Sequence, residues 1–309
     1  MTDSAIHIEK LEKIYKARGR QKEKAALHGV DLAIPKGSVF GLLGPNGAGK
    51  STIINIMAGL VTKSAGHVKI WDYDIDTHER QAKAAIGVVP QEINFDPFFT
   101  PRQLLDLQAG LYGVPKKERR TMALLDLVGL SAQADSYTRS LSGGMRRRLM
   151  VAKAMVHAPP ILVLDEPTAG VDIELRRGLW DNVRALNRAG TTVLLTTHYL
   201  EEAEQLCDRI AIINHGRIIV CEEKETLLAR IDQKEIVFRL DRALQEIPEG
   251  LAAYAPEQQG RRSLKCRYSP ASGAVGEMIA ALQKSGYRIA DISTDESDLE
   301  DIFIKLTKS

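Results

Sequence analysis

The sequence predicts an α/β fold that is followed by a smaller α+β domain. Continuous apolar runs at residues 38–43 (SVFGLL) and 161–164 (ILVL) have the length and composition of parallel strands buried on both faces. Stretches with helical periodicity separate such runs. After about Glu225 the composition changes, and no catalytic motif follows. We therefore expect two domains, at residues 1–222 and 223–309.

The bulk composition excludes several classes of protein. The 309 residues suit one large domain or two ordinary ones, and 44% hydrophobic with 27% charged residues is typical of a globular chain. A net charge of +2 argues against a nucleic-acid-binding surface spread over the whole protein. No apolar run approaches the roughly 18 residues that span a bilayer, and the N-terminus has no apolar signal core. We therefore expect a chain that does not itself cross a membrane. The three cysteines are far apart and are best interpreted as small buried hydrophobic residues.

The first ninety residues predict strands on both sides of a glycine-rich loop. Residues 6–14 alternate between apolar and polar, and the basic run at residues 16–24 is best interpreted as a solvated loop. Further strands are expected at residues 28–34, 66–71 and 84–89.

The loop itself, residues 44–52 (GPNGAGKST), fits the phosphate-binding pattern G-x-x-x-x-G-K-[ST]. Glycines let backbone N–H groups approach phosphate oxygens closely. Lys50 would reach the β- and γ-phosphates, and the Ser51 hydroxyl would bind Mg²⁺. The helix expected from about residue 50 to 58 turns the positive end of its dipole toward the phosphates. We expect the whole loop to bind nucleotide: Gly44, Pro45, Asn46, Gly47, Ala48, Gly49, Lys50, Ser51 and Thr52.

A helical subdomain is expected at about residues 95–160. Thr100 can cap a helix with Pro101 at its first position, and residues 119–128 form a second amphipathic helix. LSGGM, at residues 141–145, precedes a third helix that runs to about residue 157. Ser142 either only caps that helix or also leaves glycine N–H groups free to bind an anion, and the motif alone leaves both interpretations open.

Two carboxylates end the buried run at residues 161–164. Open α/β sheets bind ligands at the carboxyl ends of their strands, where Asp165 and Glu166 stand. Asp165 would hold Mg²⁺, and Glu166 would polarise the water that attacks the γ-phosphate. The alternative, two surface acids, is disfavoured beside a phosphate loop, because hydrolysis needs the loop, a metal ligand and a base together.

The remaining elements complete the two expected domains. A helix at residues 180–188, a buried strand at 191–197 and a hairpin at 209–220 with its turn at 214–216 are expected in the first. The second is expected to hold strands at residues 236–240, 264–268 and 287–292, a helix at 274–284, and a final helix that begins with a capping box at 297–300.

Over residues 6–221 these motifs resemble those of the ATP-binding subunits of ABC transporters. GPNGAGKST is similar to the Walker A loop, ILVLDE to Walker B, and LSGGM to the signature loop. The resemblance assigns Gln91 as the Q-loop glutamine and Asp172 as the D-loop aspartate. It assigns His198 as the switch histidine and Tyr15 as the aromatic residue that stacks on adenine. His198 with Glu201 three residues on is only a weak zinc pattern.

The resemblance implies a P-loop NTPase core of the ABC type, with an antiparallel β subdomain and a helical subdomain. It implies a head-to-tail homodimer that encloses two ATP molecules with Mg²⁺. Each ATP would lie between the Walker A loop of one copy and Ser142, Gly143 and Gly144 of the other. His198 would contact the γ-phosphate, and Gln91 would contact Mg²⁺ and link the site to a separate permease in the membrane. The chain would then sit on the cytoplasmic face of that membrane.

Several features resemble the export-type (ABC-2) subfamily of drug exporters and YadG-like ATPases, which partner a separate six-helix permease. Met145 stands where glutamine is usual, and basic residues 146–148 follow it. In the family, the region at residues 92–99 forms part of the groove that receives a helix of the permease. Phe95, Phe98 and Phe99 are either anchors in that groove or core residues of the helical subdomain.

Two other functions are weighed against the transport motor. ABC proteins that act on ribosomes or nucleic acid usually carry two motif sets or long coiled-coil insertions; this sequence shows neither, so no nucleic acid is expected. A regulatory switch with little turnover has no need of the base expected at Glu166. GTP is a lesser alternative to ATP, since stacking on Tyr15 does not select the base.

Overall fold

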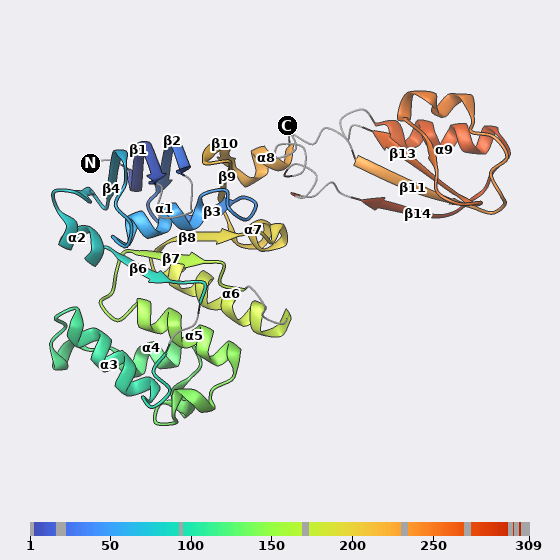
Figure 1. Cartoon of the computed structure of the whole chain (residues 1–309). Coiled ribbons are helices and arrows are strands. Elements are labelled where there is room, and N and C mark those ends of the chain that lie inside the picture. The colour runs from blue at the N-terminus through green and yellow to red at the C-terminus, as the bar shows by residue number, and fades with distance from the viewer. Residues whose placement is uncertain are drawn as a thin grey trace. The chain divides into compact units, whose positions relative to one another are not determined.

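The computed structural model describes residues 3–16, 23–92, 95–168, 173–229, 234–268 and 273–295, together with Leu299 and Phe303. The chain divides into two compact units, Met1–Lys224 and Glu225–Ser309 (Figure 1).

A six-stranded sheet forms the centre of the first unit, in the order β10-β9-β3-β8-β7-β6. Its strands are β3 (Val39–Leu43), β6 (Ile86–Val89), β7 (Ile161–Asp165), β8 (Thr192–Thr197), β9 (Arg209–Asn214) and β10 (Arg217–Glu223). All neighbours pair in parallel except β9 and β10, which form the predicted hairpin. Every residue of β3, β7 and β8 is buried, which confirms the interpretation of their continuous apolar runs.

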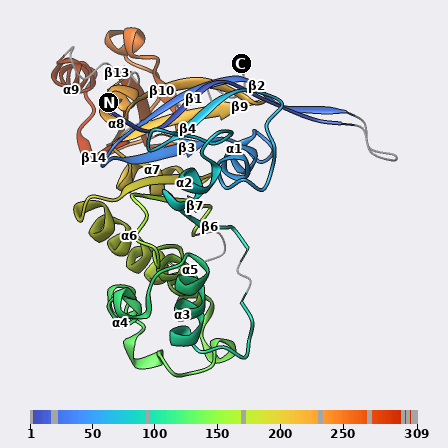
Figure 2. The ribbon, with the colours of Figure 1, turned by 90° about the vertical axis from the view of Figure 1, so that its left-hand side faces the viewer.

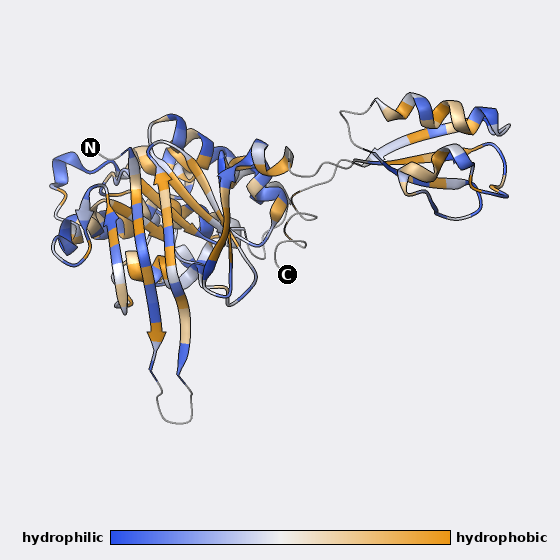
Figure 3. Ribbon diagram, turned by 90° about the horizontal axis from the view of Figure 1, so that it is seen from above, coloured by the Kyte–Doolittle hydropathy of each residue, from blue (hydrophilic) through white to orange (hydrophobic). Residues whose placement is uncertain are grey.

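A second, antiparallel sheet has the order β2-β1-β4-β5. It consists of β1 (Ser4–Tyr15), β2 (Lys24–Pro35), β4 (Ala65–Ile70) and β5 (Tyr73–Asp74). The far ends of β1 and β2 project beyond the rest of the unit (Figure 2). Buried and exposed residues alternate along the inner half of β2, and Figure 3 shows the corresponding alternation of apolar and polar residues.

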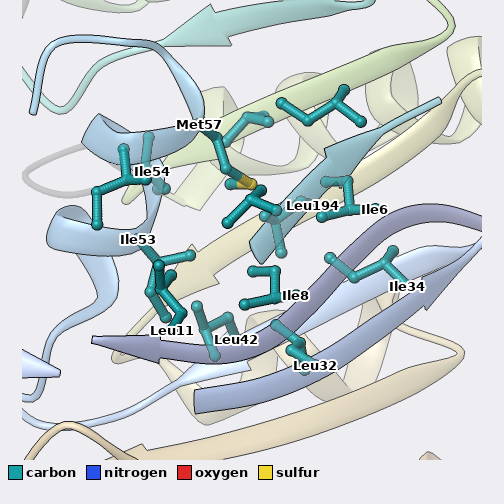
Figure 4. Close-up of a cluster of buried hydrophobic side chains, with 14 of the residues drawn as sticks. Ile6, Ile8, Leu11, Leu32, Ile34, Leu42, Ile53, Ile54, Met57 and Leu194 are labelled. Carbon is teal, nitrogen blue, oxygen red and sulfur yellow. The ribbon is translucent and has the colours of Figure 1, made fainter. Parts of the chain in front are cut away.

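Helix α1 (Lys50–Met57) packs between the two sheets in one hydrophobic cluster (Figure 4). Fully or almost fully buried side chains from three sources meet there. The antiparallel sheet contributes Ile6, Ile8 and Leu11, the parallel sheet contributes Leu42 and Leu194, and the helix contributes Ile53, Ile54 and Met57. Interiors this closely packed leave side chains little freedom. The start of α1, where the phosphate loop ends, is therefore fixed by the core.

Helices α3 (Pro101–Leu111), α4 (Thr121–Leu127) and α5 (Gly143–Ala154) lie together on the side of the parallel sheet away from β1 and β2 (Figure 1). The predicted cap of α3 is confirmed, because Thr100 and Gln103 form a reciprocal capping box. Helix α6 (Ile173–Arg188) is longer than the helix expected at residues 180–188.

The sequence analysis did not anticipate three short helices, α2 (Glu79–Ala84), α7 (Leu200–Leu206) and α8 (Lys224–Ala229). Each is about two turns long, which is too short to show a clear helical period. The strand expected from residue 84 begins at Ile86, since Ala84 still belongs to α2. Helix α8 follows β10.

The second unit is a small α+β domain, as predicted. Strands β11 (Lys234–Leu240), β12 (Glu257–Gln258), β13 (Ser263–Tyr268) and β14 (Ile289–Asp295) form an antiparallel sheet in the order β12-β13-β11-β14. Helix α9 (Ala274–Lys284) buries Met278 and Leu282 with Phe238 and Leu264 of the sheet. The helix expected from residue 297 lies outside the described residues. Within the described part of the chain, no helix is long and apolar enough to cross a bilayer.

Candidate functional site

The phosphate loop connects β3 to α1 and needs its glycines. A Cβ atom on Gly44 would lie 2.3 Å from the carbonyl oxygen of Ile213. Gly49, the residue that caps α1, has a φ of +116°, and a Cβ there would lie 2.8 Å from the side chain of Leu27. A Cβ on Gly47 would face open space. The loop is thus packed closely on its inner side and open on the side where a phosphate would bind.

Lys50 is the first residue of α1 and is only 5% exposed. Its ammonium group donates to the carbonyl oxygens of Gly44 (2.6 Å) and Pro45 (3.3 Å), and lies 3.6 Å from Glu166 Oε1. Burial lowers the pKa of Lys50, and the carboxylate of Glu166 opposes that shift. The ammonium group is therefore held inside the loop by carbonyls that a phosphate oxygen can replace.

Glu166 is the point on which three of the predicted residues converge. Its Oε2 accepts a hydrogen bond from Gln91 Nε2 (3.1 Å) and lies 3.2 Å from His198 Nδ1. Its Oε1 faces Lys50. Glu166 has a φ of 46°, a left-handed conformation that is strained for a residue with a side chain. Its backbone N–H donates to Thr196 O (3.0 Å) and Thr196 Oγ1 (3.1 Å), and these two contacts hold the conformation.

Thr196 is a site residue that the sequence analysis missed. It is fully buried at the end of β8, where it pairs in register with Asp165 at the end of β7. Its hydroxyl donates to Asp165 Oδ1 (2.6 Å). One hydroxyl therefore orients both predicted carboxylate residues. The only sequence signal for Thr196 is a threonine at the carboxyl end of an apolar strand. That signal identifies a site residue only once it is known that β8 lies next to β7.

Replacing Thr196 with Val is expected to raise the Mg²⁺ concentration needed for half-maximal ATP hydrolysis. The change removes the donor to Asp165 but keeps the side-chain shape, so a buried carboxylate oxygen is left unsatisfied. The free energy of unfolding should fall by about 1–3 kcal/mol. Activity measured over a Mg²⁺ titration, together with thermal unfolding, checks both effects.

Thr192→Val is the matched control for this change. Thr192 is also fully buried, and it stands at the other end of β8, where its hydroxyl accepts a hydrogen bond from the N–H of Gly37 (2.9 Å). The control should lose stability without a change in the Mg²⁺ requirement. Equal Mg²⁺ dependence in both variants would contradict the role given to Thr196.

A cavity of about 400 Å³ lies over the phosphate loop, a size typical of ligand sites. Tyr15 lines it at the end of β1, with its side chain 40% exposed and the Lys13 ammonium 4.9 Å from its ring centroid. The predicted residues that line the same cavity are Asn46, Gly47, Ala48, Gly49, Lys50, Ser51, Thr52, Gln91 and Glu166. An open aromatic face at the rim can stack on a base.

A neighbouring cavity of about 740 Å³ is lined by all three predicted metal ligands, Ser51, Gln91 and Asp165. Mg²⁺ prefers oxygen ligands and is usually bound through one or two carboxylates together with phosphate oxygens. A hydroxyl, an amide and a carboxylate in the lining of one cavity fit that preference, so the residues present suit Mg²⁺.

The signature loop stands apart from this site. Ser142 caps α5, and its hydroxyl accepts a hydrogen bond from the N–H of Met145 (3.2 Å), which confirms the cap that both interpretations share. Ser142 and Gly143 are exposed, and Gly144 is buried. None of the three is among the described residues that line the cavity over the phosphate loop. Asp172, the predicted D-loop residue, lies outside the described residues.

Comparisons with known proteins agree with this geometry. Residues 27–169 match the family model described as ABC transporter. The chain is 37% identical to the daunorubicin resistance ATP-binding protein DrrA2 of Streptomyces coeruleorubidus, over 99% of this chain and 96% of the relative. It is 36% identical to the linearmycin resistance ATP-binding protein LnrL of Bacillus subtilis, over 96% and 97% of the two chains.

Solved structures show the same fold over almost three quarters of the chain. The structure of an ATP-binding subunit of an ABC transporter is 26% identical with a TM-score of 0.65, and covers 74% of this chain and 93% of that one. A dimeric ATP-binding cassette in a post-hydrolysis state with ADP and phosphate is 27% identical with a TM-score of 0.62, and covers 71% and 98%.

Proposed function

The chain belongs to the ABC transporter family, as its full-length relatives show, and on that premise we propose that it powers export through a separate permease in the membrane. It is an ATPase that binds and hydrolyses ATP. The observation that carries the proposal is the convergence of Lys50, Gln91 and His198 on Glu166 beside the phosphate loop.

The proposed mechanism assigns one task to each of these groups. Lys50 exchanges the carbonyl of Gly44 for phosphate oxygens of ATP. The carboxylate of Glu166 then accepts a proton from the attacking water, with Gln91 and His198 holding it in place. When bound to Ser51, Asp165 and Gln91, Mg²⁺ would neutralise charge on the β- and γ-phosphates.

We further propose that two copies of the chain form a homodimer with two ATP sites. Ser142 and Gly143 are exposed and lie outside the cavity of their own copy, so they are free to contact ATP held by a partner copy. The start of α5 is then an anion-binding helix end supplied from across the interface. A solved relative of this fold is described as dimeric.

The membrane partner, the direction of transport and the cellular location belong to the same proposal. Relatives named for drug resistance match almost the whole chain, and one named for Nod factor export is 40% identical over 74% of it. We propose that this chain drives export from the cytoplasmic face of a membrane, with residues 1–222 carrying the nucleotide chemistry and residues 223–309 forming an accessory unit. The permease, not this chain, would bind the substrate.

The test is to identify what co-purifies with a tagged Glu166→Gln form from membranes solubilised in mild detergent with ATP and Mg²⁺. This substitution should hold the ATP-bound dimer together. A polytopic membrane protein in stoichiometric amount is the expected result. Recovery of ribosomes, or of a dimer alone, would reject the export motor and favour a soluble ABC ATPase or a switch.

Replacing Phe98 with Ala is expected to uncouple ATP hydrolysis from transport in the complex with the permease. Phe98 is 69% exposed, with the Arg139 guanidinium 5.9 Å from its ring centroid, whereas Phe95 and Phe99 are partly buried, so Phe98 is the most accessible of the three to a partner. Transport should fall severalfold while ATPase activity and the melting temperature stay close to those of the unmodified chain. Tyr73→Ala, at a 39% exposed aromatic residue on β5, is the control and should leave transport unchanged. Parallel loss of transport, ATPase activity and stability in the Phe98 variant would instead indicate a core role.

A further inference from the structure

Three consecutive arginines near the start of α5 each bind a different part of the backbone. Arg146 Nε donates to Leu141 O (2.9 Å), within the signature loop itself. Arg147 Nη1 donates to Gln91 O (2.8 Å) and Pro90 O (3.2 Å), in the segment that follows β6. Arg148 Nη1 donates to Val128 O (2.8 Å), at the end of α4. Of these three, only Arg147 contacts a residue of the ATP site.

Arg147 is also the most deeply buried of the three, at 5% exposure. Burying a guanidinium group is unfavourable unless hydrogen bonds compensate for the lost hydration, and burial lowers the pKa of Arg147. Its bonds to two successive carbonyls fix the main chain at Gln91. An arginine that only held two helices together would not need to bind Gln91. Arg148 plays such a role, because it joins α5 to the end of α4 without contacting the ATP site.

The contact continues from Gln91 to the catalytic carboxylate. The main-chain oxygen of Gln91 accepts from Arg147, and the Gln91 side chain donates to Glu166 Oε2 (3.1 Å). In the other direction from Arg147, α5 is capped by Ser142, five residues earlier in the chain. An unbroken series of contacts therefore joins the signature loop to Glu166, by way of α5 and Gln91.

We propose that Arg147 is a positioning residue that couples the signature loop of one ATP site to the hydrolytic base of the other. The proposal rests on the proposed dimer, in which Ser142 contacts ATP bound by the partner copy. Docking of Ser142 on that ATP would move the rigid helix α5, and Arg147 would carry the movement to Gln91. Gln91 would then set Glu166 and the Mg²⁺ ligands for hydrolysis. Arg suits this task because its planar group holds its acceptors in a fixed direction.

The test compares Arg147→Met with Arg148→Met in the full-length chain. Both changes remove a guanidinium and keep an unbranched stem, but only the first breaks the bond to Gln91. For Arg147→Met we expect kcat to fall about tenfold, the Mg²⁺ concentration for half-maximal activity to rise severalfold, and the Kd for ATP to stay within about twofold. Arg148→Met should lower the melting temperature with kcat and the Mg²⁺ requirement unchanged. Arg147→Lys, which keeps the charge and one donor, should recover part of kcat.

A double variant shows whether Arg147 acts through Gln91. If it does, Arg147→Met added to Gln91→Ala should cause no further loss of kcat, because the two residues act in series. The proposal would be overturned if the double variant lost kcat by the product of the two single losses. It would also be overturned if kcat fell in proportion to the melting temperature in both the Arg147 and the Arg148 variants. Failure of the proposed dimer would look different, since the Glu166→Gln form would then stay monomeric in the presence of ATP and Mg²⁺, whatever the Arg147 variants do.

Discussion

Replacing Glu166 with Gln is expected to slow ATP hydrolysis by about 10²- to 10⁴-fold while ATP binding persists. The amide keeps the shape of the side chain but cannot accept a proton from water. The ammonium group of Lys50 stays in place at the phosphate loop, so the affinity for ATP should change little. Single-turnover hydrolysis and equilibrium binding of ATP by the full-length chain measure the two effects separately.

Glu201→Gln is the matched control for the Glu166 variant. Glu201 is exposed on α7, where it lies 3.7 Å from Arg176, and it is not among the described residues that line the cavity over the phosphate loop. The control should keep kcat within about twofold, and it also tests the weak zinc pattern formed with His198. A Glu166→Gln variant that retained more than about a tenth of kcat would show that another group is the base.

Replacing Lys50 with Met is expected to raise the Kd for ATP about 30-fold or more. Met keeps an unbranched, buried stem at the first position of α1 but removes the ammonium group from the phosphates. Lys50 is 5% exposed, so water screens its attraction for phosphate less than it would at the surface. Equilibrium titration with ATP checks the affinity, and thermal unfolding checks that the variant folds.

Lys24→Met makes the same change in charge at the rim of the same cavity. Lys24 is exposed, and one exposed cation contributes little to the affinity for ATP. The Kd of the Lys24→Met variant for ATP should therefore rise less than about fivefold. Equal effects at the two positions would mean that the overall charge of the cavity, and not the placement of Lys50, determines the affinity.

The sequence alone predicted the parts of the site that are encoded locally. The phosphate loop was predictable because Gly44, Gly49 and Lys50 stand at fixed spacings between a strand and a helix, and their backbone conformations depend on near neighbours. The cap of α3 at Thr100 and the buried strands were predictable for the same reason. The exposure of Phe98 was not, since an aromatic residue in a loop is compatible with either a core or an interface.

Only the tertiary structure decided which distant residues meet. Strand β8 lies between β3 and β7, which are far apart in the sequence, and this order brings Thr196 against Asp165 and Glu166. The same holds for Arg147, whose target at Gln91 lies 56 residues earlier in the chain. A motif specifies the conformation of its own segment through short-range sterics and hydrogen bonds. Contacts between segments depend on strand order and on the packing of the helices, which no local pattern records.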